Sequence, residues 1–365
     1  MCRLALLVFF VLAVFAGCQN NTDSMESRLS ALQRWMESSS PPAVSMEMPL
    51  YMVSEVVLSP ESCNYEYFFI ESFDIQDGKV FITDGRSSAL LAYTLDGELL
   101  WKAGGAGEGP GLFSGIGEVA VRGDTLAVCN HGLGRIDLFS SITGEWLSSI
   151  PVQWPFDLAY LPDGHILAAS IMEPYLLSVL SSEGEVVTSF GQWEAPGGDL
   201  LNSMFGTSNR NIHIALLNDS IVAVNSYYFN WMQIYNINTE QLLGCFRRDL
   251  PFEEIEVRME NGVFRGKIYT SDIAACNGYI VVKHRPIEEN WDLPQMFSSD
   301  VPYDELDYSM ADVFNCEGDY MGSFAFNRSV GKLLWHDDTL YCATDDTGEL
   351  IRYETVSAGE LLNRN

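Results

Sequence analysis

One pattern of four short apolar runs recurs along most of this chain, and it constrains the fold more than any other feature. In the clearest copy each run alternates polar and apolar residues and ends at a turn signal such as Asp77-Gly78 or Asp96-Gly97, which are typical of β-hairpins. The copies recur at intervals of about 40 to 45 residues, a period typical of β-propeller blades. The six copies span Phe73–Gly104, Gly117–Ile150, Phe156–Gly191, His213–Phe246, Ser271–Phe326 and Gly331–Val356.

The last copy contains only three apolar runs, so its fourth strand must come from elsewhere in the chain. The segment Tyr51–Ser59 precedes the first copy and alternates as a strand does. A blade buries its faces only against neighbouring blades, so pairing of this segment with the last copy would close a ring. The sequence therefore predicts an all-β fold, a six-bladed β-propeller with four-stranded antiparallel blades, in which the N-terminal strand closes the last blade.

The linker after the first copy carries a family likeness. It reads GGAGEGPGLF, Gly104–Phe113, and it resembles the GPGEF or GPGQF linker of NHL-repeat proteins and of bacterial six-bladed β-propeller lipoproteins, with Leu112 in place of the acidic or amide residue. The resemblance extends over about Tyr51–Thr355 and is strongest in the first three copies. It implies the fold but no single activity, because such propellers have unrelated functions.

The first residues have the composition of a processing signal. Arg3 is followed by an apolar run, Leu4–Phe15, which is too short to span a membrane and fits the core of a signal peptide. The next residues, ending at Cys18, resemble a bacterial lipobox, in which the cysteine is lipidated. We therefore expect a protein of the cell envelope, lipid-anchored on the periplasmic or outer side of a membrane, with ordinary secretion as the alternative. The expected divisions are a signal peptide at 1–17, a tether at 18–50, the propeller at 51–356 and a tail at 357–365.

Charge and cysteine spacing narrow the function classes. The chain has 20 basic and 50 acidic residues, a formal net charge of −30, and such a field repels nucleic acid. We therefore expect no nucleic-acid partner. The six cysteines outside the signal region show no CxxC or CxxH spacing, which argues against a zinc site and favours small buried side chains, with disulfides left open.

Strand order within a blade divides the connections between the two faces of the disc. With strands A to D running outwards from the axis, the A–B and C–D turns lie on one face, and the B–C loops and D–A linkers lie on the other. The turns of the first face are uniformly short, whereas every long insertion belongs to the second face, at Gln192–Asn211, Arg247–Thr270 and His284–Asp307. Long loops on a rigid scaffold often carry function. We therefore expect this second face, named the loop face from here on, to be the functional one.

Candidate ligand-binding residues gather on the loop face. Aromatic rings suit glycan stacking or peptide recognition, although packing of the loops onto the disc is the alternative for each ring. Arg86, Arg135 and His131 occupy B–C regions, where ion pairing between blades or a structural role is the alternative. The candidate aromatic residues are Trp193, Tyr227, Tyr228, Trp291 and Tyr303.

Three functional hypotheses remain. No GxSxG, P-loop or HExxH motif is present, which favours a non-enzymatic module without a cofactor that binds peptide, protein or glycan on the loop face. The resemblance implies an alternative, a metal-dependent hydrolase or lyase of the gluconolactonase-like or NHL type, with its site at the central channel. Glu118, Asp157 and His213 are then the candidate ligands of a divalent ion such as Ca²⁺. The third hypothesis is a structural subunit of an envelope assembly.

Overall fold

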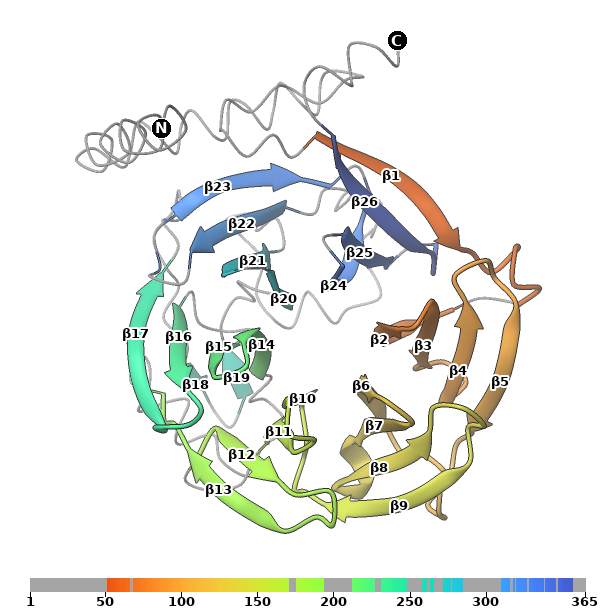
Figure 1. Cartoon of the computed structure of the whole chain (residues 1–365), viewed down its shortest axis with the longest axis horizontal. Coiled ribbons are helices and arrows are strands. Elements are labelled where there is room, and N and C mark those ends of the chain that lie inside the picture. Colours follow the sequence, from red (N-terminus) through yellow and green to blue (C-terminus); the bar gives the residue numbers. More distant parts are fainter. Residues whose placement is uncertain are drawn as a thin grey trace.

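Six four-stranded antiparallel sheets surround one axis in the computed structural model of the chain (Figure 1). This arrangement confirms the predicted six-bladed β-propeller. The structure describes residues 51–65, 68–170, 175–193, 212–226, 231–247, 258–260, 263–265, 272–276, 278–284, 310–315, 318, 320–326, 328–337, 339–345 and 347–356.

Each blade is built in chain order from its innermost to its outermost strand. Blade 1 contains β2 (Ile70–Gln76), β3 (Lys79–Asp84), β4 (Ala89–Thr94) and β5 (Leu99–Gly104). Blade 2 contains β6 (Ile116–Arg122), β7 (Thr125–Asn130), β8 (Arg135–Ser140) and β9 (Trp146–Pro151). Blade 3 contains β10 (Asp157–Tyr160), β11 (Ile166–Ala169), β12 (Leu177–Leu180) and β13 (Val186–Phe190).

The later blades keep this order in spite of their weaker sequence repeats. Blade 4 contains β14 (Ile212–Asn218), β15 (Ile221–Ser226), β16 (Trp231–Asn236) and β17 (Gln241–Arg247). Blade 5 contains β20 (Asp272–Cys276), β21 (Tyr279–His284), β22 (Met310–Asn315) and β23 (Tyr320–Ala325). Blade 6 contains β24 (Val330–His336), β25 (Thr339–Thr344), β26 (Leu350–Val356) and β1 (Tyr51–Leu58).

The ring is closed by the N-terminal strand, as the sequence predicts. Strand β1 pairs antiparallel with β26, from Tyr51 opposite Val356 to Leu58 opposite Leu350. Leu58 is 1% exposed and belongs to a hydrophobic cluster that joins residues of blades 6 and 1. The first strand in the sequence therefore supplies both the outer edge of the last blade and part of the seam between the two ends of the propeller.

The core is divided into six hydrophobic clusters, one at each contact between neighbouring blades. Strand β7 shows how the sequence produces this division. Its Leu126 and Val128 pack towards blade 1, whereas Ala127 and Cys129 pack towards blade 3. Successive side chains of a strand point to opposite faces, so a strand buried on both faces needs a continuous apolar run.

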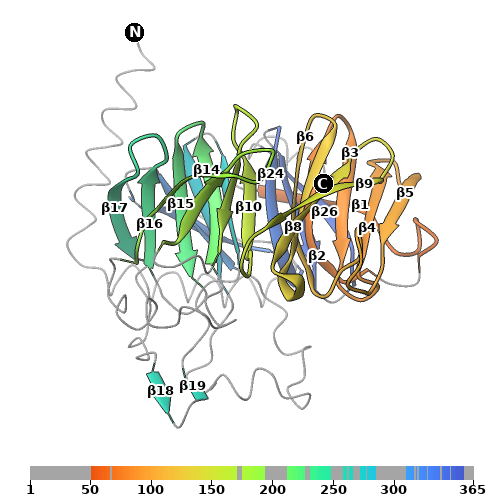
Figure 2. The same cartoon turned by 90° about the horizontal axis from the view of Figure 1, so that it is seen from below.

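Short turns close one face of the disc, as expected. In the first A–B turn both Asp77 (φ 52°) and Gly78 (φ 71°) have positive φ, the conformation of a type I′ hairpin turn. The opposite, loop face carries the D–A linkers. In the linker between blades 4 and 5 a small hairpin of β18 (Arg258–Glu260) and β19 (Val263–Arg265) lies beyond this face, apart from the disc (Figure 2).

Helix is almost absent from the described residues, where the one helical element is the 3₁₀ turn η1 (His131–Leu133). In this part of the chain no helix is long and apolar enough to cross a bilayer. Two described cysteines, Cys129 and Cys342, are buried, as expected for small apolar side chains. Cys245 is exposed, in contrast to that expectation.

Candidate functional site at the propeller axis

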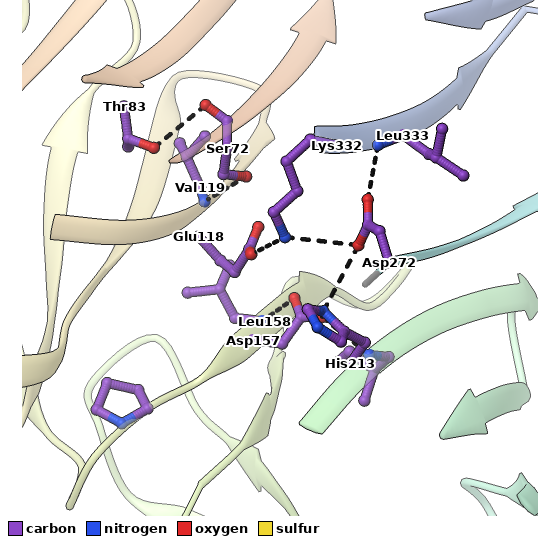
Figure 3. A network of polar contacts seen from close by, with 12 residues as sticks. Ser72, Thr83, Glu118, Val119, Asp157, Leu158, His213, Asp272, Lys332 and Leu333 are labelled. Atoms are coloured by element: carbon purple, nitrogen blue, oxygen red, sulfur yellow. Dashed lines mark hydrogen bonds and ion pairs between the residues drawn. The ribbon is translucent and has the colours of Figure 1, made fainter. Parts of the chain in front are cut away.

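Six equivalent positions surround the axis, each within the first three residues of an inner strand. Inner strands begin where the D–A linkers enter them, so these positions lie towards the loop face. Five of the six side chains are titratable, and Figure 3 shows that they converge. The six positions are occupied by Ser72, Glu118, Asp157, His213, Asp272 and Lys332. We name the five titratable residues the axial cluster.

Alternate blades use these positions differently. In blades 1, 3 and 5 a short side chain accepts a hydrogen bond from the backbone N–H of the next blade, which ties the blades in pairs. These bonds run to Ser72 from Val119 (3.3 Å), to Asp157 from Ile214 (2.8 Å) and to Asp272 from Leu333 (2.6 Å). In blades 2, 4 and 6 the longer side chains of Glu118, His213 and Lys332 meet the others near the axis (Figure 3).

Lys332 is the one ammonium group of the axial cluster. Its Nζ donates to the Glu118 carboxylate and lies 3.5 Å from Oδ1 of Asp272. The lysine belongs to blade 6 and Glu118 to blade 2, so the side chain passes blade 1. The side chains of Lys332 and Glu118 are each 14% exposed, so the ion pair is largely shielded from water.

His213 lies between two carboxylates. Its Nδ1 is 3.5 Å from Oδ1 of Asp272 and 3.7 Å from Oδ2 of Asp157. Burial, together with the nearby Lys332 ammonium, lowers the pKa of His213 to about 4. Burial raises the pKa of Asp157 to about 7, against the opposite effect of Lys332. At neutral pH the imidazole is therefore uncharged, and Asp157 is close to its midpoint of titration.

Glu71 adds a further carboxylate beside the axial cluster. It is the extra residue of a bulge between Ile70 and Ser72, and its side chain lies over Gly85 of the next loop, where a Cβ would be 2.5 Å from Oε1 of Glu71. Partial burial, together with the neighbouring Glu118 carboxylate, raises the pKa of Glu71 to about 7. The glycine at position 85 therefore makes room for a half-buried acid on the loop side of the cluster.

A glycine also faces a polar side chain in blades 2 and 6. There the glycine lies on the inner strand and the polar residue lies in the loop, the reverse of blade 1. The loop residue that corresponds to Gly85 is His131 in blade 2, where a Cβ on Gly117 would be 2.0 Å from Nε2 of the histidine. In blade 6 it is Asp345, where a Cβ on Gly331 would be 2.2 Å from Oδ1. A polar side chain thus lies over the start of the inner strand in each of these blades.

The sequence predicts three members of the axial cluster, and the structure brings them together. Glu118, Asp157 and His213 are the predicted candidate metal ligands, because the repeat places them at the channel-facing ends of inner strands. The sequence analysis does not predict Asp272 and Lys332, although both occupy the same inner-strand position in the fifth and sixth repeats. Alignment of the six repeats on their inner strands is the signal that could have found them.

The described residues do not fit a metal ion as they stand. Within the described part of the chain no group of three or more His, Cys, Asp or Glu residues is placed to hold one. The Lys332 ammonium instead lies among the carboxylates that a metal ion would need. A divalent ion at this point would be repelled by that ammonium unless the lysine moved away.

Arg135 fastens the glycine-rich linker to blade 2. Its Nε donates to the buried Asp137 (2.9 Å), and its Nη2 donates to the carbonyls of Gly109 (2.8 Å) and Leu112 (3.1 Å). Arg135 therefore holds the backbone of the glycine-rich linker against blade 2. These contacts match the structural alternative for Arg135, whose role in ligand binding stays a prediction.

The other candidate ligand-binding residues lie at different places. Trp193 is 2% exposed in the cluster between blades 3 and 4, where packing is its visible role. The His131 ring contacts the carbonyl of Pro155, whereas Arg86 is exposed and donates its backbone N–H to Asp84. Their ligand roles stay predictions. Five predicted residues fall outside the described residues, namely Cys18, Tyr227, Tyr228, Trp291 and Tyr303.

Comparison with known proteins supports the fold. No protein-family model matches the chain, and no curated protein matches its sequence. The structure is similar to that of a candidate exported protein from Bacteroides fragilis, with a TM-score of 0.56 and 11% identity over 86% of this chain and 98% of that chain. It is also similar to a member of the DUF4221 family from Bacteroides vulgatus, with a TM-score of 0.53 and 9% identity over 84% of this chain and 97% of that chain. At such identities the likeness shows a shared β-propeller fold.

Proposed function

We propose that the chain is an exported, lipid-anchored β-propeller that binds a peptide or protein on its loop face and does not transform it chemically. The signal-like segment that ends at Cys18 supports export and anchoring. The likeness to a candidate exported protein from Bacteroides fragilis is consistent with the same location. A rigid disc with loops on one face suits recognition, and many propellers act as platforms of this kind.

The observation that carries the proposal is an excess of carboxylates on the loop side of the axis. Glu118 and Asp272 contact the Lys332 ammonium, Asp157 and Glu71 lie close by, and the buried Lys283 ammonium is placed 4.0 Å from Asp345. The pKa values of Glu71 and Asp157 are raised to about 7, so both acids gain charge readily when a cation approaches. A lysine or arginine side chain of a polypeptide supplies such a cation, whereas a neutral glycan does not.

Titration with labelled peptides tests this proposal. A dye-labelled peptide of alternating lysine and glycine is compared with its glutamate counterpart by fluorescence anisotropy. We expect Glu71→Gln to weaken binding of the lysine peptide about tenfold, or about 1.4 kcal/mol. Asp96→Asn is the matched control, because it removes one charge from an exposed turn on the opposite face. Equal losses in the two variants would show a general charge effect and contradict the proposed site.

Lipid anchoring needs a separate test. Cells expressing the full chain are labelled with a radioactive fatty acid and then fractionated. We expect label in the wild-type chain, none in Cys18→Ser, and release of that variant from the membrane fraction. Membrane retention of unlabelled Cys18→Ser would contradict the anchor without affecting the proposed ligand face.

The two other hypotheses receive less support. A metal-dependent hydrolase or lyase requires a cation where Lys332 already lies between Glu118 and Asp272. A purely structural subunit makes no use of the carboxylate excess. The peptide titration separates this last case, because a structural subunit would bind neither peptide.

A further inference from the structure

A second set of equivalent positions lies three residues before the six axial positions, in the D–A linkers of the loop face. In three blades the backbone carbonyl of this residue accepts a hydrogen bond from the N–H of the B–C loop, which shows that the positions correspond. These bonds run to Phe69 from Gly85 (2.8 Å), to Gly115 from His131 (2.8 Å) and to Ser329 from Asp345 (3.3 Å). In chain order the six positions are occupied by Phe69, Gly115, Trp154, Arg210, Tyr269 and Ser329.

Aromatic and small residues alternate at these positions. Phe69 of blade 1 is 50% exposed and Trp154 of blade 3 is 36% exposed, so both rings are open to solvent on the loop face. Blades 2 and 6 have Gly115 and Ser329 there. Tyr269 continues the alternation in the sequence of blade 5, but it lies outside the described residues. The blades with short axial side chains are therefore those with an aromatic residue before the inner strand.

Phe69 is held beside a carboxylate of the proposed ligand site. Its backbone N–H donates to Oδ1 of the buried Asp84 (3.0 Å), and its carbonyl accepts from Gly85. A Cβ on Gly85 would lie 2.9 Å from Cδ1 of Phe69 and 2.5 Å from Oε1 of Glu71. The ring and the carboxylate thus lie over the same glycine, and an apolar surface adjoins the acid to which the proposed function assigns the cation of the ligand.

Trp154 is held in a strained conformation. Its φ of 50° lies in the left-handed region, which residues with a side chain rarely adopt. The backbone is fixed on both sides, by Val152 N–H to the carbonyl of Gly134 (3.0 Å) and by Phe156 N–H to the carbonyl of Ala169 (2.8 Å). Strain of this kind persists where the surrounding structure imposes it, and it is often found at binding sites. Here it presents a partly exposed indole rather than a glycine.

We infer that Phe69 and Trp154 bind apolar side chains of the peptide ligand, so that the preferred ligand is a segment in which a lysine or arginine is flanked by aromatic or large apolar residues. This inference rests on the proposed function and names the class of peptide. The carboxylates near the axis attract the basic residue, and the exposed rings supply apolar area beside them. Aromatic rings of this kind supply much of the binding energy in peptide and protein recognition.

Fluorescence anisotropy with two dye-labelled peptides tests the inference. One peptide carries a lysine between two phenylalanines and the other a lysine between two glycines. We expect the wild type to bind the phenylalanine peptide about tenfold more tightly. Phe69→Ala and Trp154→Ala should each reduce this preference at least threefold and leave the affinity for the glycine peptide unchanged. The matched controls on the outer strand β9, Leu147→Ala (50% exposed) and Trp146→Ala (39% exposed), should keep the preference.

The outcomes separate this inference from the proposed function. Glu71→Gln should weaken the binding of both peptides alike. An unchanged preference in both Phe69→Ala and Trp154→Ala would overturn the inference and leave the proposed function standing, whereas a wild type that binds neither peptide would overturn both.

Trp154→Gly supplies a second variant that does not depend on the folding of the alanine variants. Glycine adopts a positive φ without strain, so Trp154→Gly should be at least as stable in urea as the wild type and should still lose the preference. A less stable Trp154→Gly that keeps the preference would show that the indole serves packing, which contradicts the inference.

Discussion

The Lys332 ammonium of blade 6 forms an ion pair with the Glu118 carboxylate of blade 2, two blades that are not neighbours in the ring (Figure 3). The contact forms near the axis, where the inner strands β24 and β6 of these two blades begin (Figure 3). Lys332 also contacts Asp272 of blade 5. His213 of blade 4 then lies between Asp272 and Asp157 of blade 3. A polar network therefore connects five of the six blades independently of the hydrophobic clusters.

We first predict that Lys332→Met destabilises the fold by about 3 kcal/mol, because removal of one partner leaves shielded carboxylates without a counter-charge. The free energy of unfolding is measured by urea denaturation. Glu118→Gln in the same chain removes one of the two stranded charges, so the double variant should recover about 1 to 2 kcal/mol relative to additivity. Strictly additive losses would show that the two side chains do not interact.

The second prediction concerns the closing strand. Leu58→Ala should cost about 2 to 4 kcal/mol, because the side chain is 1% exposed in the cluster between blades 6 and 1. Val56→Ala, on the same strand but 39% exposed, should cost less than about 0.5 kcal/mol. Urea denaturation of the two variants compares them directly. Similar losses at both positions would contradict the packing of β1 against blade 1.

Much of the fold could be predicted because the features that define it are local. The Asp77-Gly78 turn, the alternating runs and the missing strand of the last repeat are all visible in short stretches of sequence. The pairing of β1 with β26 followed from the need to complete the last blade. In each case a neighbouring segment of chain, or a simple requirement of ring closure, determines the structure.

The candidate site could be predicted only in part, because its contacts depend on the geometry of the whole ring. Glu118 and Lys332 are 214 positions apart, and no local pattern relates them. A search for metal ligands also passes over a lysine. Trp193 shows the same limit for aromatic residues, since a ring that packs between blades and a ring that faces a ligand have the same local sequence pattern.

The third prediction is a pair of opposite pH effects at the axis. Between a pH of about 4 and about 7 the folded chain holds a proton on Asp157 that the unfolded chain has released, so stability falls as pH rises. Glu71 and Asp74, with pKa values raised to about 7 and about 6 chiefly by burial, act in the same direction. The contribution of His213 to stability rises with pH instead, because its folded-state pKa of about 4 lies below the unfolded value of 6.5.

Urea denaturation at several pH values between about 4 and 7 measures these effects. We expect wild-type stability to fall across this range, less steeply in Asp157→Asn and more steeply in His213→Gln. Lys332 and Asp272 face both groups and stay unchanged in the two variants. Slopes that change in the same direction in both variants would contradict the assigned protonation states.

The last prediction tests the packing of His131 over the start of β6. A Cβ on Gly117 would lie 2.0 Å from Nε2 of His131, and the ring is held by the carbonyl of Pro155 and by Phe156, 6.3 Å away between ring centroids. Gly117→Ala should therefore cost about 1 to 3 kcal/mol in urea denaturation. Gly244→Ala, in strand β17, has nothing within 4 Å of its new methyl group and should be neutral or slightly stabilising.

Removal of the histidine identifies the cause of this loss. If the clash with His131 is responsible, Gly117→Ala should cost little in a chain that already carries His131→Ala, and the two changes should couple by about 1 to 2 kcal/mol. A full loss in that background would place the constraint on the backbone of Gly117 instead. In that case the glycine would serve the bulge of β6, and the exchange of glycine and polar side chain among blades 1, 2 and 6 would be a consequence of backbone geometry.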